Sequence, residues 1–420
     1  MRLVLMLIVL AGLQSTPSDP RPRARDLGIA PGAMDPGALN AITDVPGVLV
    51  GQVTVRAGDH VRTGVTAILP HGGNLFRDKV PGAVFVGNAF GKLAGSTQVE
   101  ELGTIESPIV LTNTLSVGAA LDAVVRWTVA QPGNENVRSV NGLVGETNDG
   151  SLNDIRGFHV TREHVTAAIA GAKSGAVEEG AVGAGTGTVA FGWKGGIGTS
   201  SRLVRMQDAT YTIGVLVQSN YGGKLTIAGV PVWKELTPRG LTPGENPRGL
   251  TPAEIQRGSG PLSQRGSGPL SPDGSCMIVV ATDAPLDARD LERLAARAIF
   301  ALARTGSTYS NGSGDFAIAF GRGLTPAEIQ RGSGPLPADI QRGSGPLPAE
   351  IQRGSGPLPQ RGSGPLSSDV ISPLFEAVLD ATEEAVYNSM LKAVDTTGNG
   401  RTVRALPIDR LRALLKKYGR

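Results

Sequence analysis

Short apolar segments separated by turn residues recur along the chain and predict a β-rich core. Segments 45–55 and 63–70 have the pattern of strands interrupted by Pro-Gly turns, and 211–223 predicts a strong strand that ends in a turn. Segment 275–282 (SCMIVVAT) is continuously apolar, as expected for a strand buried on both faces. Segment 316–320 (FAIAF) predicts a further strand.

Helical patterns alternate with these strands. Asp287 is a suitable N-cap with Asp290 three residues on, and Gly306 ends the helix. Its apolar face, at 3.6-residue spacing, comprises Leu291, Leu294, Ala295, Ala298, Ile299 and Leu302. A second helix is predicted from Ser372 as N-cap, with Pro373 at the first helical position, to about residue 394. Segment 408–417 is a short amphipathic helix and 165–180 is partly helical. The alternation, without a clear βαβ run, favours a layered α/β sandwich.

Two segments, 236–272 and 322–366, have the composition of low-complexity insertions. The heptapeptide QRGSGPL occurs six times across them, at Gln256, Gln264, Gln330, Gln341, Gln352 and Gln360. Each repeat is rich in glycine and proline and has few apolar side chains, so it cannot offset the entropy lost on ordering. We interpret both segments as flexible loop insertions, with a binding role as the alternative.

The N-terminal segment has the pattern of a secretory signal peptide. Arg2 precedes an apolar run at 3–13, followed by Gln14, Ser15 and Thr16, and eleven apolar residues are too few to span a bilayer. We therefore predict a signal peptide and polar tail at 1–19 and a secreted or periplasmic protein. The alternatives are an uncleaved anchor or a wrongly assigned start. No later segment predicts a membrane span in the mature form.

Composition narrows the function classes. The formal charge of +3 is small, and only 4% of residues are aromatic, which argues against nucleic acid as a partner. Cys276 is the only cysteine, so the chain has no internal disulfide. Four scattered histidines lack ligand spacing, and we predict no metal site. The glycine-rich segment 182–202 lacks the motifs of nucleotide-binding loops, so we predict no cofactor.

Ser275 is the leading candidate for a nucleophile because it lies where a repeat segment meets a buried strand. Cleavage of the Gly274–Ser275 bond would give it a free α-amine with a pKa of about 7.7–8, able to accept the hydroxyl proton without a histidine. Gly274 would favour the cut through its backbone freedom and by crowding the attacking hydroxyl least. The alternative is that DGS is merely a turn before a strand.

Three further polar residues lie at the ends of predicted strands. Ser313 and Asp315, in STYSNGSGDFAIAF, could orient the amine or relay its proton. Asn220, in QSNYGG, could offer its side-chain amide to a developing oxyanion. Taken singly, each of these segments is also typical of an ordinary polar turn.

Several blocks in the same order resemble the L-aminopeptidase/D-esterase family, a self-processing group that includes the DmpA-like and β-peptidyl aminopeptidases. The resemblance covers about residues 25–411 apart from the repeats. It is carried by TDVPGVLVGQVTV, QVEELGTIESPIVLTNTLSVG, VGAGTGTVAFGWKGGIGTSSR, GSCMIVVATDAPL, GSGDFAIAF and SPLFEAVLDATEEAVYNS. It implies a four-layer αββα sandwich that resembles N-terminal-nucleophile hydrolases but has different connectivity.

The resemblance also implies roles for individual residues. It implies self-cleavage before Ser275, giving an α chain (20–274) and a β chain (275–420) of one catalytic domain, assembled as oligomers that are often tetramers of αβ units. Ser275 matches the nucleophile, Ser313 and Asp315 the supporting pair, and Asn220 the oxyanion donor. The ETND segment lies near the family's substrate pocket.

In that segment Glu146 is a plausible anchor for a substrate ammonium group. Some family members have tyrosine where this chain has Asn148, so the second oxyanion donor stays open.

Together these observations predict an autoproteolytically activated serine aminopeptidase or amidase, with esterase activity as an extension. It would release N-terminal amino acids from peptides, amides or esters through an acyl-enzyme on Ser275. One alternative is an acyltransferase of the ornithine-acetyltransferase type, although those enzymes use threonine as nucleophile. Another is a non-catalytic exported protein that binds through its repeats. The preferred acyl residue (L-α, D-α or β) depends on pocket shape, which the sequence leaves open.

Overall fold

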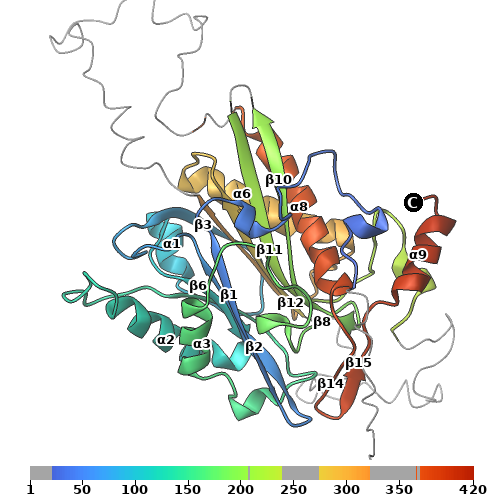
Figure 1. Cartoon of the computed structure of the whole chain (residues 1–420), viewed down its shortest axis with the longest axis horizontal. Helices are drawn as coiled ribbons and strands as arrows, with labels where there is room; N and C mark the ends of the chain where they lie inside the picture. Colours follow the sequence, from blue (N-terminus) through green and yellow to red (C-terminus); the bar gives the residue numbers. More distant parts are fainter. Residues whose placement is uncertain (1–20, 207–208, 239–273, 322–365, 367–368) are drawn as a thin grey trace, which may run out of the picture.

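The computed structural model describes residues 21–206, 209–238, 274–321, 366 and 369–420 (Figure 1). The predicted signal peptide and tail at 1–19, and nearly all of the predicted insertions at 236–272 and 322–366, lie outside the described residues. Leu236, at the start of the first insertion, is buried in an apolar cluster with the last helix. The folded core therefore includes this residue.

Among the described residues, one sheet contains five strands in the order β1-β2-β6-β7-β4. Their bounds are Leu49–Ala57 (β1), Val61–Leu69 (β2), Ile109–Asn113 (β6), Leu143–Thr147 (β7) and Leu93–Ala94 (β4). β1 and β2 form an antiparallel hairpin, whereas β6 and β7 are parallel and are connected through helix α2, Val117–Val129. Parallel neighbours require such a crossover.

The second sheet described contains six strands in the order β10-β11-β12-β13-β3-β5. Their bounds are Gly196–Met206 (β10), Ala209–Asn220 (β11), Ser275–Thr282 (β12), Gly314–Gly321 (β13), Val80–Ala89 (β3) and Thr104–Ile105 (β5). β10, β11 and β12 are successively antiparallel. β12 and β13 are parallel and are connected through helix α6, Ala288–Thr305.

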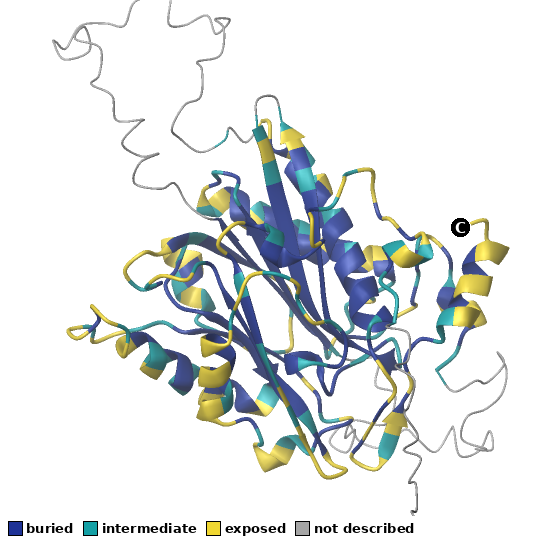
Figure 2. Cartoon of the chain, viewed as in Figure 1, coloured by how far each residue is buried: buried dark blue, intermediate teal, exposed yellow. Residues whose placement is uncertain are grey.

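The two sheets pack face to face with helices on both outer faces, which confirms the predicted αββα sandwich (Figure 1). α2 and α3 (Arg162–Ala170) cover the first sheet, and α6 and α8 (Ser372–Leu391) cover the second. The strands are mostly buried, as is α8, whereas α2 and α3 expose their outer faces (Figure 2). Smaller described elements are α1 (Ser96–Leu102), α4 (Val232–Glu235), α9 (Ile408–Lys417), β8 (Val189–Ala190), β9 (Trp193–Lys194), β14 (Thr396–Gly398) and β15 (Arg401–Val403).

The apolar sequence of β12 follows from its position in the middle of the sandwich. All eight of its residues are buried. Met277, Val279 and Ala281 pack between the sheets, while alternate residues Cys276, Ile278 and Val280 pack under α6 and α8. With both faces covered, neither set of alternating positions can be polar.

Most predicted elements are present, but several boundaries differ: the strand predicted at 45–55 begins at Leu49, and the segment predicted to be partly helical at 165–180 forms α3 only as far as Ala170. The Asp287 carboxylate accepts a hydrogen bond from the Asp290 amide (2.9 Å) and Gly306 ends α6 with φ +99°, as predicted. Ser372 is not the N-cap of α8 but its first residue. The cap position belongs to Ile371, which makes no side-chain cap bond and is fully buried. Core packing therefore sets this helix start. α8 ends at Leu391, three residues before the predicted end.

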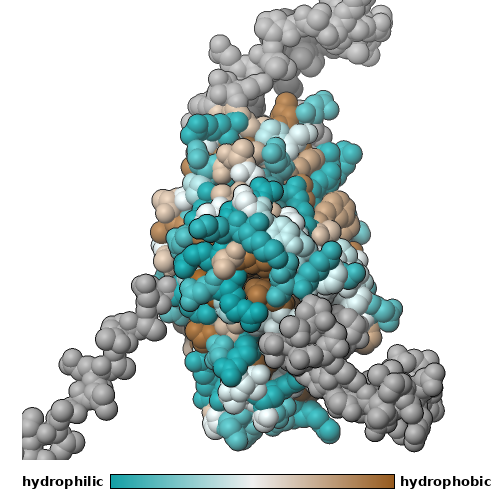
Figure 3. All heavy atoms as spheres, turned by 90° about the vertical axis from the view of Figure 1, so that its right-hand side faces the viewer, coloured by the Kyte–Doolittle hydropathy of each residue, from teal (hydrophilic) through white to brown (hydrophobic). Residues whose placement is uncertain are grey.

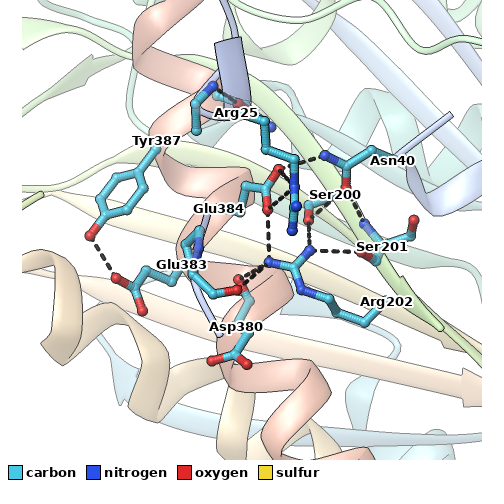
Figure 4. Close-up of polar contacts among 12 residues, drawn as sticks. Arg25, Asn40, Ser200, Ser201, Arg202, Asp380, Glu383, Glu384 and Tyr387 are labelled. Carbon is cyan, nitrogen blue, oxygen red and sulfur yellow. Dashed lines mark hydrogen bonds and ion pairs between the residues drawn. The ribbon is translucent and has the colours of Figure 1, made fainter. Parts of the chain in front are cut away.

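A buried ionic cluster joins segments from both sides of the Gly274–Ser275 bond (Figure 4). Arg202 on β10 and Glu384 on α8 are fully buried and form an ion pair at 2.7 Å. Arg25 and Asn40 also bind the Glu384 carboxylate. An unpaired charge at such a depth is strongly unfavourable. The cluster therefore ties the N-terminal segment and β10 to α8.

The surface carries mixed polarity. Hydrophilic residues dominate the face in Figure 3, with smaller hydrophobic areas between them. None of the helices in the described segments is long and apolar enough to cross a membrane.

Candidate active site

The candidate nucleophile lies at the end of a central strand of the second sheet, opposite the predicted site residue Asn220. Ser275 is the first residue of β12 and is 5% exposed. It lies directly opposite Asn220, the last residue of β11, and opposite Gly314, the first residue of β13. Side chains of directly opposed antiparallel residues typically have Cβ atoms about 4.5–5.5 Å apart. The fold thus places the Asn220 amide beside the Ser275 hydroxyl.

Gly274 lies in close backbone contact with the end of β11. A Cβ atom at this position would lie 2.1 Å from the Asn220 carbonyl oxygen and 2.5 Å from Tyr221 Cα. The close approach gives a stronger reason for glycine here than the backbone freedom inferred from sequence. The Gly274 carbonyl oxygen accepts a hydrogen bond from the Gly314 amide at 3.0 Å. The carbonyl group of the bond predicted to break is therefore held in a fixed position.

Ser313 and Asp315 form a buried pair beside Ser275. The Ser313 hydroxyl donates to Asp315 Oδ1 at 2.9 Å, and Asp315 lies opposite Cys276 in the β12–β13 register. Burial raises the pKa of the Asp315 carboxyl to about 6, although Ser313 and the Cys276 amide favour its charged form. The structure thus places the Ser313–Asp315 pair at the start of the strand that pairs with the one beginning at Ser275.

Two hydrogen bonds fix the side-chain amide of Asn220. Its Oδ1 accepts from the Val189 amide at 2.8 Å, and its Nδ2 donates to the Asn148 carbonyl oxygen at 3.0 Å. Exchanging the amide oxygen and nitrogen would place donor against donor and acceptor against acceptor, so the network selects one orientation. The second Nδ2 hydrogen is then available to a ligand.

Asn148 contributes to the site through its backbone. Its carbonyl holds Asn220, while its exposed side-chain Oδ1 accepts from the Gly150 amide at 2.9 Å in a local turn. A direct role of the Asn148 side chain in substrate binding stays a prediction.

Glu146 belongs to the first sheet and lies close to the strand ends of the second sheet that carry the site. It lies near the end of β7 and accepts hydrogen bonds from the Lys92 amide (3.1 Å) and from the Thr114 hydroxyl. Glu146 and Gly314 lie on either side of Gly91. A Cβ atom added to Gly91 would lie 3.4 Å from Glu146 Oε1 and 3.3 Å from Gly314 Cα. Burial raises the pKa of the Glu146 carboxyl. The carboxylate is therefore a buried hydrogen-bond acceptor close to the first residues of β12 and β13.

Sequence reasoning missed residues whose hydrogen bonds connect the site to neighbouring strands and loops. Gln218, two residues before Asn220, donates to Thr147 Oγ1 on the other sheet (2.8 Å) and to the Thr112 and Ala184 carbonyls. Lys194 is fully buried beneath the loop that contacts Asn220. A lysine among the apolar and glycine residues of FGWKGGIG was the one available signal for it.

Comparison with known proteins defines the family. The model of peptidase family S58 matches residues 40–403. This chain belongs to peptidase family S58. It is 44% identical, over 74% of its length and 77% of the relative, to β-peptidyl aminopeptidase BapA of Sphingosinicella microcystinivorans.

Solved structures agree with this assignment. The PH0078 protein of Pyrococcus horikoshii superposes with a TM-score of 0.74 at 41% identity, covering 95% of this chain and 99% of that one. The L-aminopeptidase D-Ala-esterase/amidase of Ochrobactrum anthropi gives 0.73 at 35% identity with the same coverage, and is described as a prototype of serine aminopeptidases and a variant of the Ntn hydrolase fold.

These matches confirm the predicted family, fold class and enzyme class. The S58 chain is a hydrolase of the serine aminopeptidase and amidase type, with the N-terminal-nucleophile-type fold. The individual roles of Ser275, Asn220, Ser313, Asp315 and Glu146 stay predictions, and are taken up below.

Proposed function

We propose that the chain cleaves itself between Gly274 and Ser275 and then uses Ser275 as an N-terminal nucleophile. The observation that carries this proposal is the position of Ser275 at the very start of a fully buried strand, directly opposite Asn220 and beside the Ser313–Asp315 pair. A rigid strand presents the hydroxyl at a fixed place, and Asn220 supplies a preorganised donor.

In the first step, Ser275 Oγ attacks the Gly274 carbonyl carbon. The C–N bond of the peptide breaks, the hydroxyl proton goes to the departing nitrogen, and the acyl group is left on Oγ as an ester. The Gly314 amide, already bound to the Gly274 carbonyl oxygen, stabilises the negative charge that develops there. Water hydrolyses the ester, which leaves a carboxylate on Gly274 and a free α-amine on Ser275.

In turnover, the neutral α-amine of Ser275 takes the hydroxyl proton as Oγ attacks the carbonyl of the substrate's N-terminal residue. Asn220 Nδ2 donates to the resulting oxyanion. The leaving amine or alcohol takes the proton, and water releases the amino acid from the ester. Ionised Asp315, through Ser313, favours the orientation of the amine.

Glu146 is proposed to hold the ammonium group of the substrate. A buried carboxylate close to the nucleophile favours a free amino group over a blocked one and makes the enzyme an aminopeptidase. The substrates are peptides, amides and, by extension, esters. A panel of L-α, D-α and β-aminoacyl amides and esters would define the acyl residue.

Intact-mass measurement tests the cleavage. Purified wild type should give two fragments divided at Gly274–Ser275, and Ser275→Ala a single uncut chain. Ser107→Ala is a matched control, because Ser107 is also a buried serine but lies just before the first residue of β6, away from Ser275. It should be cut normally. A wild type that stays whole and still hydrolyses aminoacyl amides would overturn the proposal.

We also propose that the protein is exported through its N-terminal segment and assembles as an oligomer of αβ units. The supporting features are the Arg2–apolar–polar pattern of the first residues and the resemblance described above. N-terminal sequencing of protein from the medium or periplasm, together with light scattering on a sizing column, tests both points.

A further inference from the structure

Lys194 is buried in a place where a lysine is costly. It lies on β9 with no exposed surface, and burial lowers the pKa of its ammonium to about 7, with Arg56 adding to the shift. An apolar side chain of similar length would avoid this cost. The group must therefore be explained by what it contacts.

The Lys194 ammonium is coordinated by backbone oxygens of one loop. Nζ donates to the carbonyls of Gly185 (2.9 Å), Thr188 (2.8 Å) and Gly195 (2.8 Å). An ammonium has three N–H bonds, and all three are used. The Thr188 oxygen also accepts from the Gly195 amide at 3.1 Å. The buried ammonium thus connects three backbone carbonyls of the loop at 185–195.

One peptide group connects this lysine to the oxyanion donor. The carbonyl of Thr188 and the amide of Val189 belong to the same planar unit. Its oxygen binds Lys194 Nζ, and its N–H binds Asn220 Oδ1 at 2.8 Å. Fixing the carbonyl end of this plane fixes the direction of its N–H, and therefore the side-chain plane of Asn220.

The connection is also electronic. An N–H donor on the Thr188 oxygen polarises the peptide and strengthens its N–H as a donor, and it does so most when Lys194 is protonated. That N–H in turn polarises the Asn220 amide, whose Nδ2 hydrogen points to the substrate in the proposed mechanism. Chains of hydrogen bonds strengthen one another by roughly 10–30% per bond.

We infer that Lys194 is a positioning residue for the oxyanion donor: through the Thr188–Val189 peptide it orients and polarises the side-chain amide of Asn220. The inference deepens the proposed function and rests on the role of Asn220 in it. Lys194 itself touches neither substrate nor nucleophile in this assignment.

The test uses full-length, self-cleaved protein, with kcat normalised to the amount of free β-chain N-terminus. Lys194→Met keeps the length of the side chain and removes the charge and the donors. We expect kcat on an aminoacyl amide to fall by about 10- to 100-fold with KM within about twofold, since losing an oxyanion donor outright costs about 10²–10³ in kcat. Lys194→Gln, which retains two N–H bonds, should be intermediate.

A double-mutant cycle separates positioning from general stability. In the background of Asn220→Ala, Lys194→Met should lower kcat no further, because the group it acts through is gone. Lys79→Met is the matched control. Lys79 also donates to a backbone carbonyl, that of Phe76. It lies just before β3, whereas the site is at the other end of that strand, where Ala89 pairs with Gly314. The kcat of Lys79→Met should equal that of wild type.

Each outcome decides the matter. Unchanged kcat in Lys194→Met, or penalties that multiply in the double variant, would refute the inference while leaving Asn220 as the oxyanion donor. Failure of both Lys194 variants to accumulate as folded protein would assign the lysine to folding of the loop and also refute it. If Asn220→Ala alone keeps full kcat, the proposed role of Asn220 fails instead.

Discussion

Replacement of Gly274 by alanine separates self-cleavage from substrate turnover. In the uncut chain a methyl carbon at 274 would lie 2.1 Å from the Asn220 carbonyl oxygen. Because real Cβ contacts are essentially never shorter than 3.0 Å, the two backbones must separate by about 0.9 Å. The Asn220 oxygen belongs to the backbone, and the Cβ atom of an alanine is fixed by its own backbone, so no side-chain rotation relieves the clash.

A misplacement of about 1 Å at a reacting centre can cost about 10²-fold in rate. We therefore expect Gly274→Ala to slow self-cleavage on the order of 100-fold, equivalent to about 2.7 kcal/mol in the barrier. Once the bond is cut, residue 274 is a chain end and can move away. The kcat of the cleaved fraction should then equal that of wild type.

The assay follows the uncut chain by intact mass after synthesis or refolding, and measures turnover after cleavage is complete. Gly118→Ala is the control, since nothing lies within 4 Å of its Cβ position on the exposed face of α2. It should cleave at the wild-type rate. Cleavage of Gly274→Ala at that rate would refute the steric argument, and an equally reduced kcat after cleavage would show that Gly274 acts in turnover as well.

Three further predictions concern charged groups. The acid side of the kcat profile should fall in two steps: first below about 7.7–8, where the Ser275 α-amine is protonated, and more steeply below about 6, where Asp315 takes up a proton; Asp315→Asn should keep the first step and lose the second. Glu384→Gln leaves the buried Arg202 charge unpaired and should lower the unfolding free energy by about 3–5 kcal/mol in urea titrations, with kcat of the folded fraction unchanged. Glu146→Gln should lower kcat/KM at least about 30-fold for aminoacyl amides with a free amino group. N-acetylated substrates, which wild type should hydrolyse poorly, should give the same kcat/KM with both enzymes.

Local signals carried much of the fold. The continuous apolar sequence predicted β12 at its observed bounds, and Asp287 and Gly306 predicted both ends of α6, because caps and buried strands depend on a few neighbouring residues. Ser372 shows where such signals fail. The helix begins at Ser372, one residue earlier than predicted, because the burial of Ile371 outweighs a favourable capping side chain.

The same division holds at the site. The sequence by itself determined which polar residues stand at the ends of strands, Ser275 and Asn220 among them, and the family they resemble. Only the tertiary structure decided that β11 and β12 pair in the register that opposes these two residues, that Gly274 is pressed against β11, and that Lys194 holds the Thr188–Val189 peptide. Register, close approach and buried charge all depend on contacts between residues brought together by packing, and spacing along the chain does not encode them.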